Sequence, residues 1–316
     1  MYLNITIVNY RTPQLTIDCL SSLVSELEKD RDTVVVVDNA SEDGSIERIR
    51  NAINTEGWNS WASLIPSEYN GGFAFGNNVA IRSVLQNNPA AKYFLLLNPD
   101  TVVRLGAVTQ LFDFMEQNPT VGIAGSRLEN PDGSPQRSAF RFHTILSTID
   151  SGLRLGIVTS LLSKWVVAPP VPEEACQTDW VAGASMIVRR EVFEQIGLMD
   201  ESYFLYYEEV DFCLQAKRAG WDCWYVPESR VVHLVGQSSG IDSSKVKKKR
   251  LPKYWFESRQ RYFIKNHGRL YSIAVDFIWT FCYVSWELRR IIQGKPYSDP
   301  PKLLVDFIRN SSLFTK

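Results

Sequence analysis

The sequence is poor in the residues that build disulfide frameworks and structural metal sites. It has five cysteines, an odd number, widely spaced and never in a C-x-x-C arrangement, and only three histidines. This pattern indicates neither a set of disulfides nor a zinc site. A reducing, cytosolic compartment fits such thiols best.

Long apolar runs and an excess of charge are also missing. No uninterrupted apolar run reaches the roughly 20 residues that a membrane-spanning helix needs, and the closest approach, 271–286, contains Asp276. The first ten residues, MYLNITIVNY, lack the basic start and the cleavage site of a signal peptide. The formal net charge of −1 gives no overall field that favours nucleic acid. We therefore expect a cytoplasmic protein that does not bind nucleic acid.

Apolar strands, in contrast, are plentiful. With 316 residues, 45% of them hydrophobic, the chain can bury a sizeable core. To about residue 126, near-continuous apolar strands alternate with amphipathic helices, which is typical of a parallel sheet covered on both faces. The predicted strands are 3–9, 34–38, 61–66, 93–98 and 121–125, and the predicted helices are 14–28, 42–54, 77–88 and 105–117.

Polar residues follow three of these strands. They are Asn9 and Tyr10, then Asp38 and Asn39, then 98–100, which reads Asn-Pro-Asp. Because ligands of such sheets bind at the carboxyl ends of the strands, we expect these side chains to converge on one rim. Asp38 has two equally good interpretations, a turn or helix cap and a carboxylate that binds a nucleoside.

Asp100 and the glycine-rich stretch 70–78, NGGFAFGNN, also allow two interpretations each. Asn-Pro-Asp is strong turn chemistry, yet a carboxylate at the end of a buried strand could hold Mg²⁺ or Mn²⁺ together with substrate phosphates. The glycines suit a flexible loop or a close approach of backbone to phosphate and sugar. They are not a dinucleotide fingerprint, which requires G-x-G-x-x-G after the first strand.

A second group of polar residues lies in 179–234. The stretch 179–190 predicts one strand, and 221–227 and 229–235 predict two short ones. Between them, Glu208, Glu209 and Asp211 stand at a predicted helix start, where the helix dipole favours acids. Adjacent carboxylates shielded by tyrosines would also raise one pKa, as a general base requires. His233 is either a buried core residue or a metal ligand.

Seven stretches together resemble the family 2 inverting glycosyltransferases, above all the branch of bacterial rhamnosyltransferases, which has relatives that add galactofuranose. The likeness covers about residues 3–240, in family order and spacing. The stretches are TIVNYRT, VVVDNASEDGS, NGGFAFGNN, LLLNPDTVV, WVAGASMIVRR, FLYYEEVDFCLQAKRAGW and VVHLVGQSSG.

The resemblance implies a GT-A fold, with a mostly parallel nucleotide-binding sheet flanked by helices and a C-terminal helical extension. It implies that a sugar moves from a nucleotide diphosphate donor to an acceptor hydroxyl with inversion. Glu209 would be the base, and Asp211 and Glu208 would orient acceptor or base. Asp100 and His233 would bind Mg²⁺ or Mn²⁺. The donor would be bound around Val8, Asn9, Tyr10, Asp38, Asn70, Gly72, Asn77, Asn98 and Trp180.

Two positions depart from the family pattern. Asn98 stands where many members have the first Asp of Asp-x-Asp, which leaves one carboxylate and predicts a metal site completed by the donor. Glu209 replaces the more usual Asp, so the base is longer by one methylene, and the helix should sit slightly farther back from the acceptor.

The sequence predicts a catalytic domain at 1–240 and a helical extension at 241–316. Between Lys245 and Arg269 there are ten Lys and Arg against one acid, followed by a mostly apolar helix. This tail is either a hairpin packed on the catalytic domain, with its charges solvated, or an anchor on the inner face of the membrane through 245–290.

We expect a rhamnosyltransferase that uses dTDP-rhamnose and a cell-surface glycan or lipid-linked acceptor. The alternatives are transfer of a UDP-hexose or of galactofuranose, and a catalytically silent subunit that binds sugar nucleotides. The presence of both Asp100 and Glu209 argues against the silent subunit. A nicotinamide oxidoreductase is disfavoured by the missing glycine fingerprint.

Overall fold

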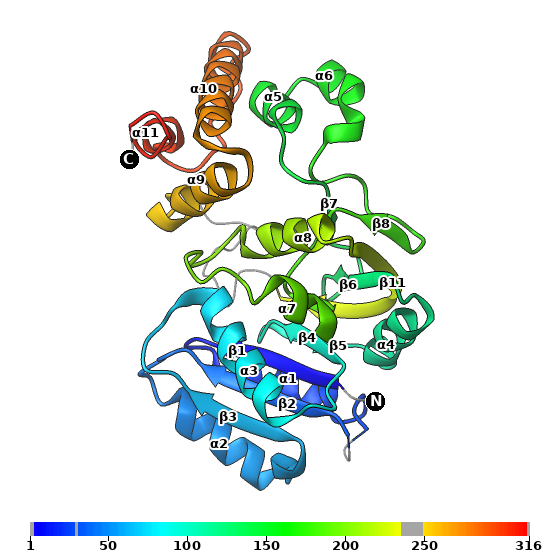
Figure 1. The fold of residues 1–316 in the computed structure, drawn as a ribbon. Coiled ribbons are helices and arrows are strands. Elements are labelled where there is room, and N and C mark those ends of the chain that lie inside the picture. The colour runs from blue at the N-terminus through cyan, green and yellow to red at the C-terminus, as the bar shows by residue number, and fades with distance from the viewer. Residues whose placement is uncertain (1–2, 29–30, 235–248, 315–316) are drawn as a thin grey trace.

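The computed structural model describes residues 3–28, 31–234 and 249–314 (Figure 1). Its N-terminal half is a parallel sheet in the order β3-β2-β1-β4, with each strand followed by a helix. The strands are β1 (Leu3–Asn9), β2 (Thr33–Asp38), β3 (Ala62–Pro66) and β4 (Tyr93–Leu97). The helices are α1 (Pro13–Leu23), α2 (Ser45–Thr55), α3 (Gly72–Asn87) and α4 (Ala107–Gln117). The predicted strands of this half are therefore confirmed.

The other half of the sheet is mixed, which the sequence did not predict. The strand β6 (Val121–Glu129) does not pair with β4, because β10 (Ser185–Arg189) lies antiparallel between them. Beyond β6 come β11 (Asp222–His233), which is parallel to it, and then β5 (Thr101–Val103) and β8 (Cys176–Thr178), both antiparallel to β11. A separate ribbon pairs β7 (Ala139–Phe140) with β9 (Trp180–Val181).

Several predicted boundaries are wrong. The stretch 179–190 is not one strand but β9 and β10, separated by Ala182, Gly183 and Ala184. The two strands predicted in 221–235 form one strand, β11, whose pairing with β6 shifts register between Val226 and Arg230. Helix α3 begins at Gly72, five residues before the predicted start, and α1 ends at Leu23 instead of residue 28.

Helices cover both faces of the sheet, so its central strands are buried. One core lies between the sheet and α1, α2 and α4. The other lies between the sheet and α3, α7 (Arg190–Ile196) and α8 (Glu208–Arg218). This arrangement leaves the carboxyl ends of the strands as the open rim.

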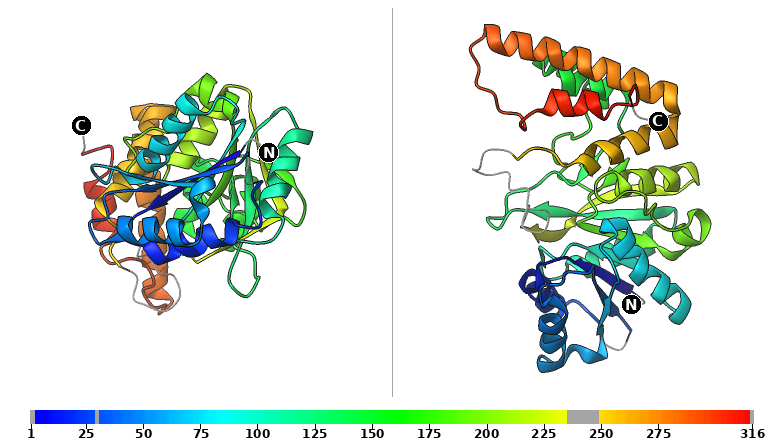
Figure 2. Two further views of the ribbon diagram at one scale, coloured as in Figure 1. Left: turned by 90° about the horizontal axis from the view of Figure 1, so that it is seen from below. Right: turned by 90° about the vertical axis from the view of Figure 1, so that its left-hand side faces the viewer.

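The C-terminal helices form a layer at the end of the molecule farthest from β3 and α2 (Figures 1 and 2). They are α9 (Lys253–His267), α10 (Arg269–Ile292) and α11 (Leu303–Arg309), and α5 (Ile145–Leu153) and α6 (Gly156–Leu161) lie beside them. Helices α5 and α10 cross closely, because a Cβ at Gly152 would lie 2.6 Å from the Cβ of Cys282. No helix among the described residues is long and apolar enough to cross a membrane.

Candidate functional site

A cavity of about 400 Å³ opens at the carboxyl ends of the strands. It is lined by residues that follow β1, β2 and β4, by the first residues of α3 and α8, and by the end of β11. Each of the three polar strand ends contributes to this lining, through Tyr10, Asn39 and residues 98–100, but Asn9 and Asp38 are not part of it. Of the predicted site residues, those in the lining are Val8, Tyr10, Asn70, Gly72, Asn98, Asp100, Glu208, Glu209 and His233.

Asp100 and His233 face each other in this cavity. The Nε2 atom of His233 lies 3.6 Å from Oδ1 of Asp100, and the Asp100 side chain is almost fully buried. The backbone fixes the pair, because Val232 and His233 pair with Val102 and Thr101 across β11 and β5, and Leu234 donates its N–H to the carbonyl of Asp100 at 2.9 Å. Asp100 belongs to a turn, as one interpretation predicts, and it also lines the cavity, so its role as a metal ligand stays a prediction.

This pair fits one divalent ion, but only in part. A carboxylate oxygen suits Mg²⁺ or Mn²⁺, imidazole is a common metal ligand, and their separation allows both to reach one ion. Within the described ranges, no group of three or more His, Cys, Asp or Glu residues is placed to hold a metal. The remaining ligands would have to come from a phosphate-bearing substrate and water.

On another wall of the cavity, helix α8 begins with two adjacent glutamates. The preceding residues, Tyr206 and Tyr207, have φ angles of 71° and 69°, a left-handed conformation that is uncommon for aromatic residues and concentrates at functional sites. The turn that they form brings Glu208 and Glu209 to the cavity. The Oε2 atom of each glutamate is buried and has no hydrogen-bond partner among the described residues.

Burial raises the pKa of Glu209 to about 7, although backbone N–H groups at the helix start oppose the shift. Burial and the neighbouring charge of Glu209 also raise the pKa of Glu208 well above its usual range. A carboxyl group with a pKa near neutrality can accept a proton at physiological pH. The prediction that adjacent, shielded acids raise a pKa here therefore agrees with the structure.

Two glycines permit the close packing around the cavity. Gly72 has a φ of 87°, and a Cβ there would lie 1.8 Å from the carbonyl oxygen of Phe204, which accepts a hydrogen bond from Phe73 N–H at 3.0 Å. A Cβ at Gly183 would lie 3.0 Å from the ring of Phe73. The glycines thus let the segment before α8 approach the start of α3.

Five predicted site residues are outside the lining of the cavity, and two of them shape the rim from behind. Asp38 is fully buried and accepts hydrogen bonds from the side chain of Asn9 at 2.6 Å and from Ser41 at 2.7 Å. The Oδ1 atom of Asn9 accepts from Thr12 and Thr16. Both side chains are engaged within the protein, so the structure favours the turn interpretation of Asp38.

The other three, Asn77, Trp180 and Asp211, point elsewhere. Asn77 donates to the carbonyl of Phe73 in its own helix, and Trp180 donates to the carbonyl of Arg141. Asp211 is buried against α9, where it accepts from Lys265 and Asn266, each at 2.6 Å. It lies in the same first turn of α8 as the cavity-facing glutamates but contacts α9 instead of the cavity, and its role as a direct orienting group stays an untested prediction.

Sequence reasoning missed part of the lining. Asn39 bridges two walls, because its side chain donates to Asn70 Oδ1 at 2.9 Å and to the carbonyl of Gly72 at 3.0 Å. Asn39 was among the strand-end residues expected on this rim, but these two hydrogen bonds were not foreseen. The apolar lining was not foreseeable, because most of it comes from loops with no periodic pattern. It consists of Phe73 at the start of α3 and of Pro99, Ala182, Gly183, Ala184, Phe204, Leu205 and Tyr206.

Comparison with known proteins identifies the family. The profile of Glycosyl transferase family 2 matches residues 5–165, about half of the chain, and that of Glycosyl transferase family group 2 matches residues 93–293. The chain belongs to glycosyl transferase family 2. The resemblance inferred from the motifs is therefore confirmed, and the protein is a glycosyltransferase.

Several curated members of the family are similar over about two thirds of the chain. The N-acetylglucosaminyl-diphospho-decaprenol L-rhamnosyltransferase of Mycobacterium tuberculosis is 28% identical, over 66% of this chain and 69% of its own. The low-salt glycan biosynthesis hexosyltransferase Agl10 of Haloferax volcanii is 31% identical, over 68% and 62%. The dTDP-rhamnosyl transferase RfbF of Shigella flexneri is 26% identical, over 70% and 66%.

Solved structures support the fold. The mannosyltransferase PcManGT of Pyrobaculum calidifontis, in complex with GDP-Man and Mn²⁺, aligns with 96% of this chain and 78% of its own, with a TM-score of 0.57 at 15% sequence identity. At that identity the likeness concerns the fold alone. The predicted GT-A fold is confirmed, and the mixed half of the sheet belongs to it.

Proposed function

We propose that this family 2 enzyme transfers L-rhamnose from dTDP-rhamnose to a hydroxyl of a cell-surface glycan or lipid-linked acceptor, with inversion at the anomeric carbon. One observation carries the proposal of catalysis: Glu209, with its pKa raised to about 7, lines the same cavity as Asp100 and His233. A base and a phosphate-binding element in one cleft are the two parts that an inverting displacement requires.

In this mechanism Glu209 acts as the general base. Its unpartnered Oε2 accepts the proton of the acceptor hydroxyl while that oxygen attacks the anomeric carbon and the bond to the diphosphate breaks. Burial and the charge of Glu209 raise the pKa of Glu208, which favours the neutral form of this neighbour. In that form Glu208 adds no second negative charge beside the base.

The diphosphate would be bound at the other wall. Asp100 and His233 would hold a Mg²⁺ or Mn²⁺ ion, which when bound supplies positive charge to the leaving diphosphate. Asn98 lies beside them in the lining and brings no charge, so the ion should bind weakly until the donor supplies further oxygen ligands.

The nucleoside and sugar would occupy the rest of the cavity. Val8 lies near the end of β1 and Tyr10 follows it. The side chains of Asn39 and Asn70, which are hydrogen-bonded to each other, offer amide groups for hydrogen bonds to base or ribose. The names of the relatives from Shigella flexneri and Mycobacterium tuberculosis support rhamnose, and that of the former supports a dTDP donor. A UDP-hexose or galactofuranose donor and a silent binding subunit remain the competing hypotheses.

A screen of nucleotide sugars tests the proposal. We expect dTDP-rhamnose with Mn²⁺ to raise the melting temperature more than UDP- or GDP-sugars do, because a ligand stabilises the state that binds it. We also expect slow, metal-dependent donor hydrolysis, detected as release of dTDP. Stronger stabilisation by UDP-hexose or UDP-galactofuranose would refute the rhamnose donor, and binding without turnover on any acceptor would indicate the silent subunit.

A further inference from the structure

One side of helix α10 is apolar along its whole length and is exposed. Leu270, Phe277, Phe281, Leu288 and Ile291 are 59–84% exposed. Val284 and Ile292 are exposed as well. These residues recur at the three- and four-residue spacing that places side chains on one side of a helix. On monomeric proteins an apolar strip of this length marks an interaction surface.

The opposite side of α10 is packed against the protein. Asp276 is buried and forms an ion pair with Arg259 of α9, and its Oδ2 accepts the N–H of Ser312 at 2.7 Å. Cys282 and Tyr283 are also buried. The side of α10 that faces the protein is therefore well packed and includes a buried ion pair. The exposed apolar side is not a consequence of poor packing.

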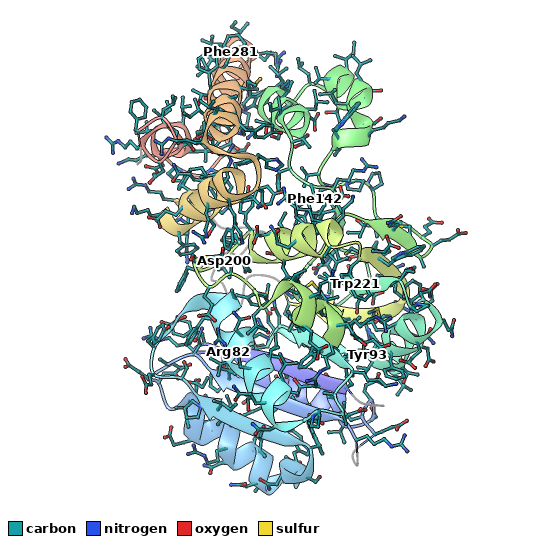
Figure 3. All side chains as sticks on the ribbon, in the orientation of Figure 1. Arg82, Tyr93, Phe142, Asp200, Trp221 and Phe281 are labelled. Atoms are coloured by element: carbon teal, nitrogen blue, oxygen red, sulfur yellow. The ribbon has the colours of Figure 1, made fainter. Side chains whose placement is uncertain are left out.

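Further exposed apolar residues lie at the same end of the molecule as α10. Helix α5 packs against α10, and α6 follows it at the same end of the molecule, with Ile157 and Leu161 71% and 74% exposed and Trp165 40% exposed just after it (Figure 1). Phe281 marks the outer end of this layer in Figure 3. Helix α10, about 36 Å long at 1.5 Å per residue, lies across that end (Figure 2).

We propose that this end of the molecule, comprising the exposed side of α10 with Ile157, Leu161 and Trp165, is a docking surface for an anionic lipid bilayer. An amphipathic helix that lies flat with aromatic and aliphatic side chains outward suits the boundary between headgroups and acyl chains. The inference does not depend on the proposed donor or acceptor.

The local charge favours an anionic surface. The ranges 154–165 and 269–295 contain six Lys and Arg against two acids, one of which is the buried Asp276. Basic residues near a bilayer are attracted to anionic headgroups. Two of the six basic residues are paired with acids, Arg290 with Glu287 in the same helix and Arg154 with Asp299.

A second copy of the chain fits this surface less well. In a coiled coil, charged residues beside the apolar seam set partner and register. Here the flanking positions include Ile273, Ile278, Thr280 and Ser285, which carry no charge. The exposed apolar residues also come from two helices, which suits a flat surface better than a single partner helix.

Within the expected membrane contact, 245–290, we assign the contact to α10 and not to the basic segment 245–269. Lys245, Lys247 and Lys248 lie outside the described residues. On α9, Arg259 pairs with Asp276, Arg261 pairs with Asp200, and Lys265 pairs with Asp200 and Asp211. These cations are engaged within the protein, so the contact is assigned to α10 and α6.

Vesicle flotation of the full chain tests the proposal. We expect binding to phosphatidylcholine vesicles that contain phosphatidylglycerol, and weaker binding to phosphatidylcholine alone. The variant Phe277→Gln/Phe281→Gln should lower the partition coefficient about tenfold or more, because it removes two large apolar side chains from the lipid contact. Both residues are exposed, so its melting temperature and metal-dependent donor hydrolysis should match those of the wild type.

The matched control is Leu105→Gln, since Leu105 is 85% exposed but lies beside α4, away from the C-terminal layer. It should bind vesicles like the wild type. Equal binding by the double variant, or no binding by the wild type to either vesicle, would overturn the proposal. So would a wild-type dimer in light scattering that the double variant converts to a monomer, because the surface would then belong to a second copy.

Discussion

At the scale of single residues, the carboxyl group of Glu209 is subject to two opposing influences. Burial disfavours its charge, whereas the backbone N–H groups at the start of α8 favour it, and burial prevails. The result is a base that is largely ionised only above neutrality. The raised pKa of Glu209 therefore depends on its position at a helix start that borders a cavity.

Replacing Glu209 by Gln should abolish proton abstraction and keep the shape of the side chain. We expect kcat/KM for transfer to fall about 10²–10⁴-fold, the usual contribution of a general base. Donor binding, measured by the thermal shift with dTDP-rhamnose and Mn²⁺, should be retained. As a control, Glu257→Gln changes a half-exposed glutamate on α9 and should leave kcat/KM unchanged. A Glu209→Gln variant with wild-type kcat/KM would contradict the assignment.

The same group predicts the pH dependence of the reaction. Because the pKa of Glu209 is raised to about 7, the base is protonated and inactive below that pH and active above it. We therefore expect kcat/KM to rise tenfold per pH unit on the acid side and to level off above about pH 7. A profile that is flat between pH 5 and 8 would show that another group accepts the proton.

If Asp100 binds the metal ion, binding of Mn²⁺ and binding of the donor should strengthen each other. The variant Asp100→Asn keeps the turn but loses the charge, so Mn²⁺ should no longer strengthen donor binding. Titration calorimetry of dTDP-rhamnose with and without Mn²⁺ measures this coupling. Asp113→Asn, which changes an exposed acid of α4, should keep the wild-type coupling. Coupling that survives in Asp100→Asn would place the ion elsewhere.

From the sequence alone, a residue could be predicted to reach the cavity only where its position at the end of a strand or the start of a helix places it there. Asp100 and Glu209 were found because a strand end and a helix start are visible in the pattern. Asp38 and Asn9 satisfy the same rule, yet their side chains are used by Ser41, Thr12 and Thr16. Such hydrogen bonds depend on tertiary placement, which no local pattern contains.

At the scale of elements, helix α8 is held by helix α9 through a charged network. Lys265 donates to Asp211 at 2.6 Å and to Asp200 at 2.9 Å, and Arg261 also pairs with Asp200. Salt bridges hold the pKa of Asp200 well below its usual range, against the effect of burial. The network joins the first turn of α8, which carries Glu209, to the C-terminal layer.

Removing Lys265 should loosen this connection. Lys265→Met leaves the buried Asp211 with the amide groups of Asn266 and Gln215 as partners but without a cation, so we expect the free energy of unfolding to fall by about 1–3 kcal/mol, less than for a fully buried pair. We expect a larger effect on kcat, which should fall, than on the KM for the donor. The variant Lys265→Arg should restore kcat. Lys253→Met removes an exposed pair on the same helix and serves as the control. If Lys265→Met is destabilised but keeps the wild-type kcat, the network stabilises the fold and does not position the catalytic helix.

Element type was more predictable than element pairing. The strands 3–9, 34–38 and 93–98 were evident because burial on both faces requires continuous apolar residues. The insertion of β10 between β4 and β6 was not, because its partners are about 60–90 residues away along the chain and any apolar strand would satisfy the pattern. The continuity of β11 across its irregular stretch is likewise a long-range property.

At the scale of the whole molecule, residues on both sides of the predicted domain boundary at residue 240 share one hydrophobic core. Tyr203 and Val210, which precede the boundary, pack in one cluster with Tyr262, Phe263 and Val275, which follow it. His143, buried beside Tyr207, also contacts the rings of Tyr262 and Phe263, and burial lowers its pKa to about 4. The C-terminal helices therefore complete the surroundings of α8.

A chain that ends at residue 240 should consequently fail to form a stable catalytic unit. It would expose the fully buried Tyr203 and leave Asp211 without Lys265 and Asn266. We expect it to show no cooperative melting transition and no stabilisation by donor and Mn²⁺, whereas the full chain melts in one transition by calorimetry. A truncated chain that melts cooperatively and binds the donor like the full chain would instead support two independent units. The expected result would mean that the C-terminal layer belongs to the folded unit that holds α8, the helix that carries the base.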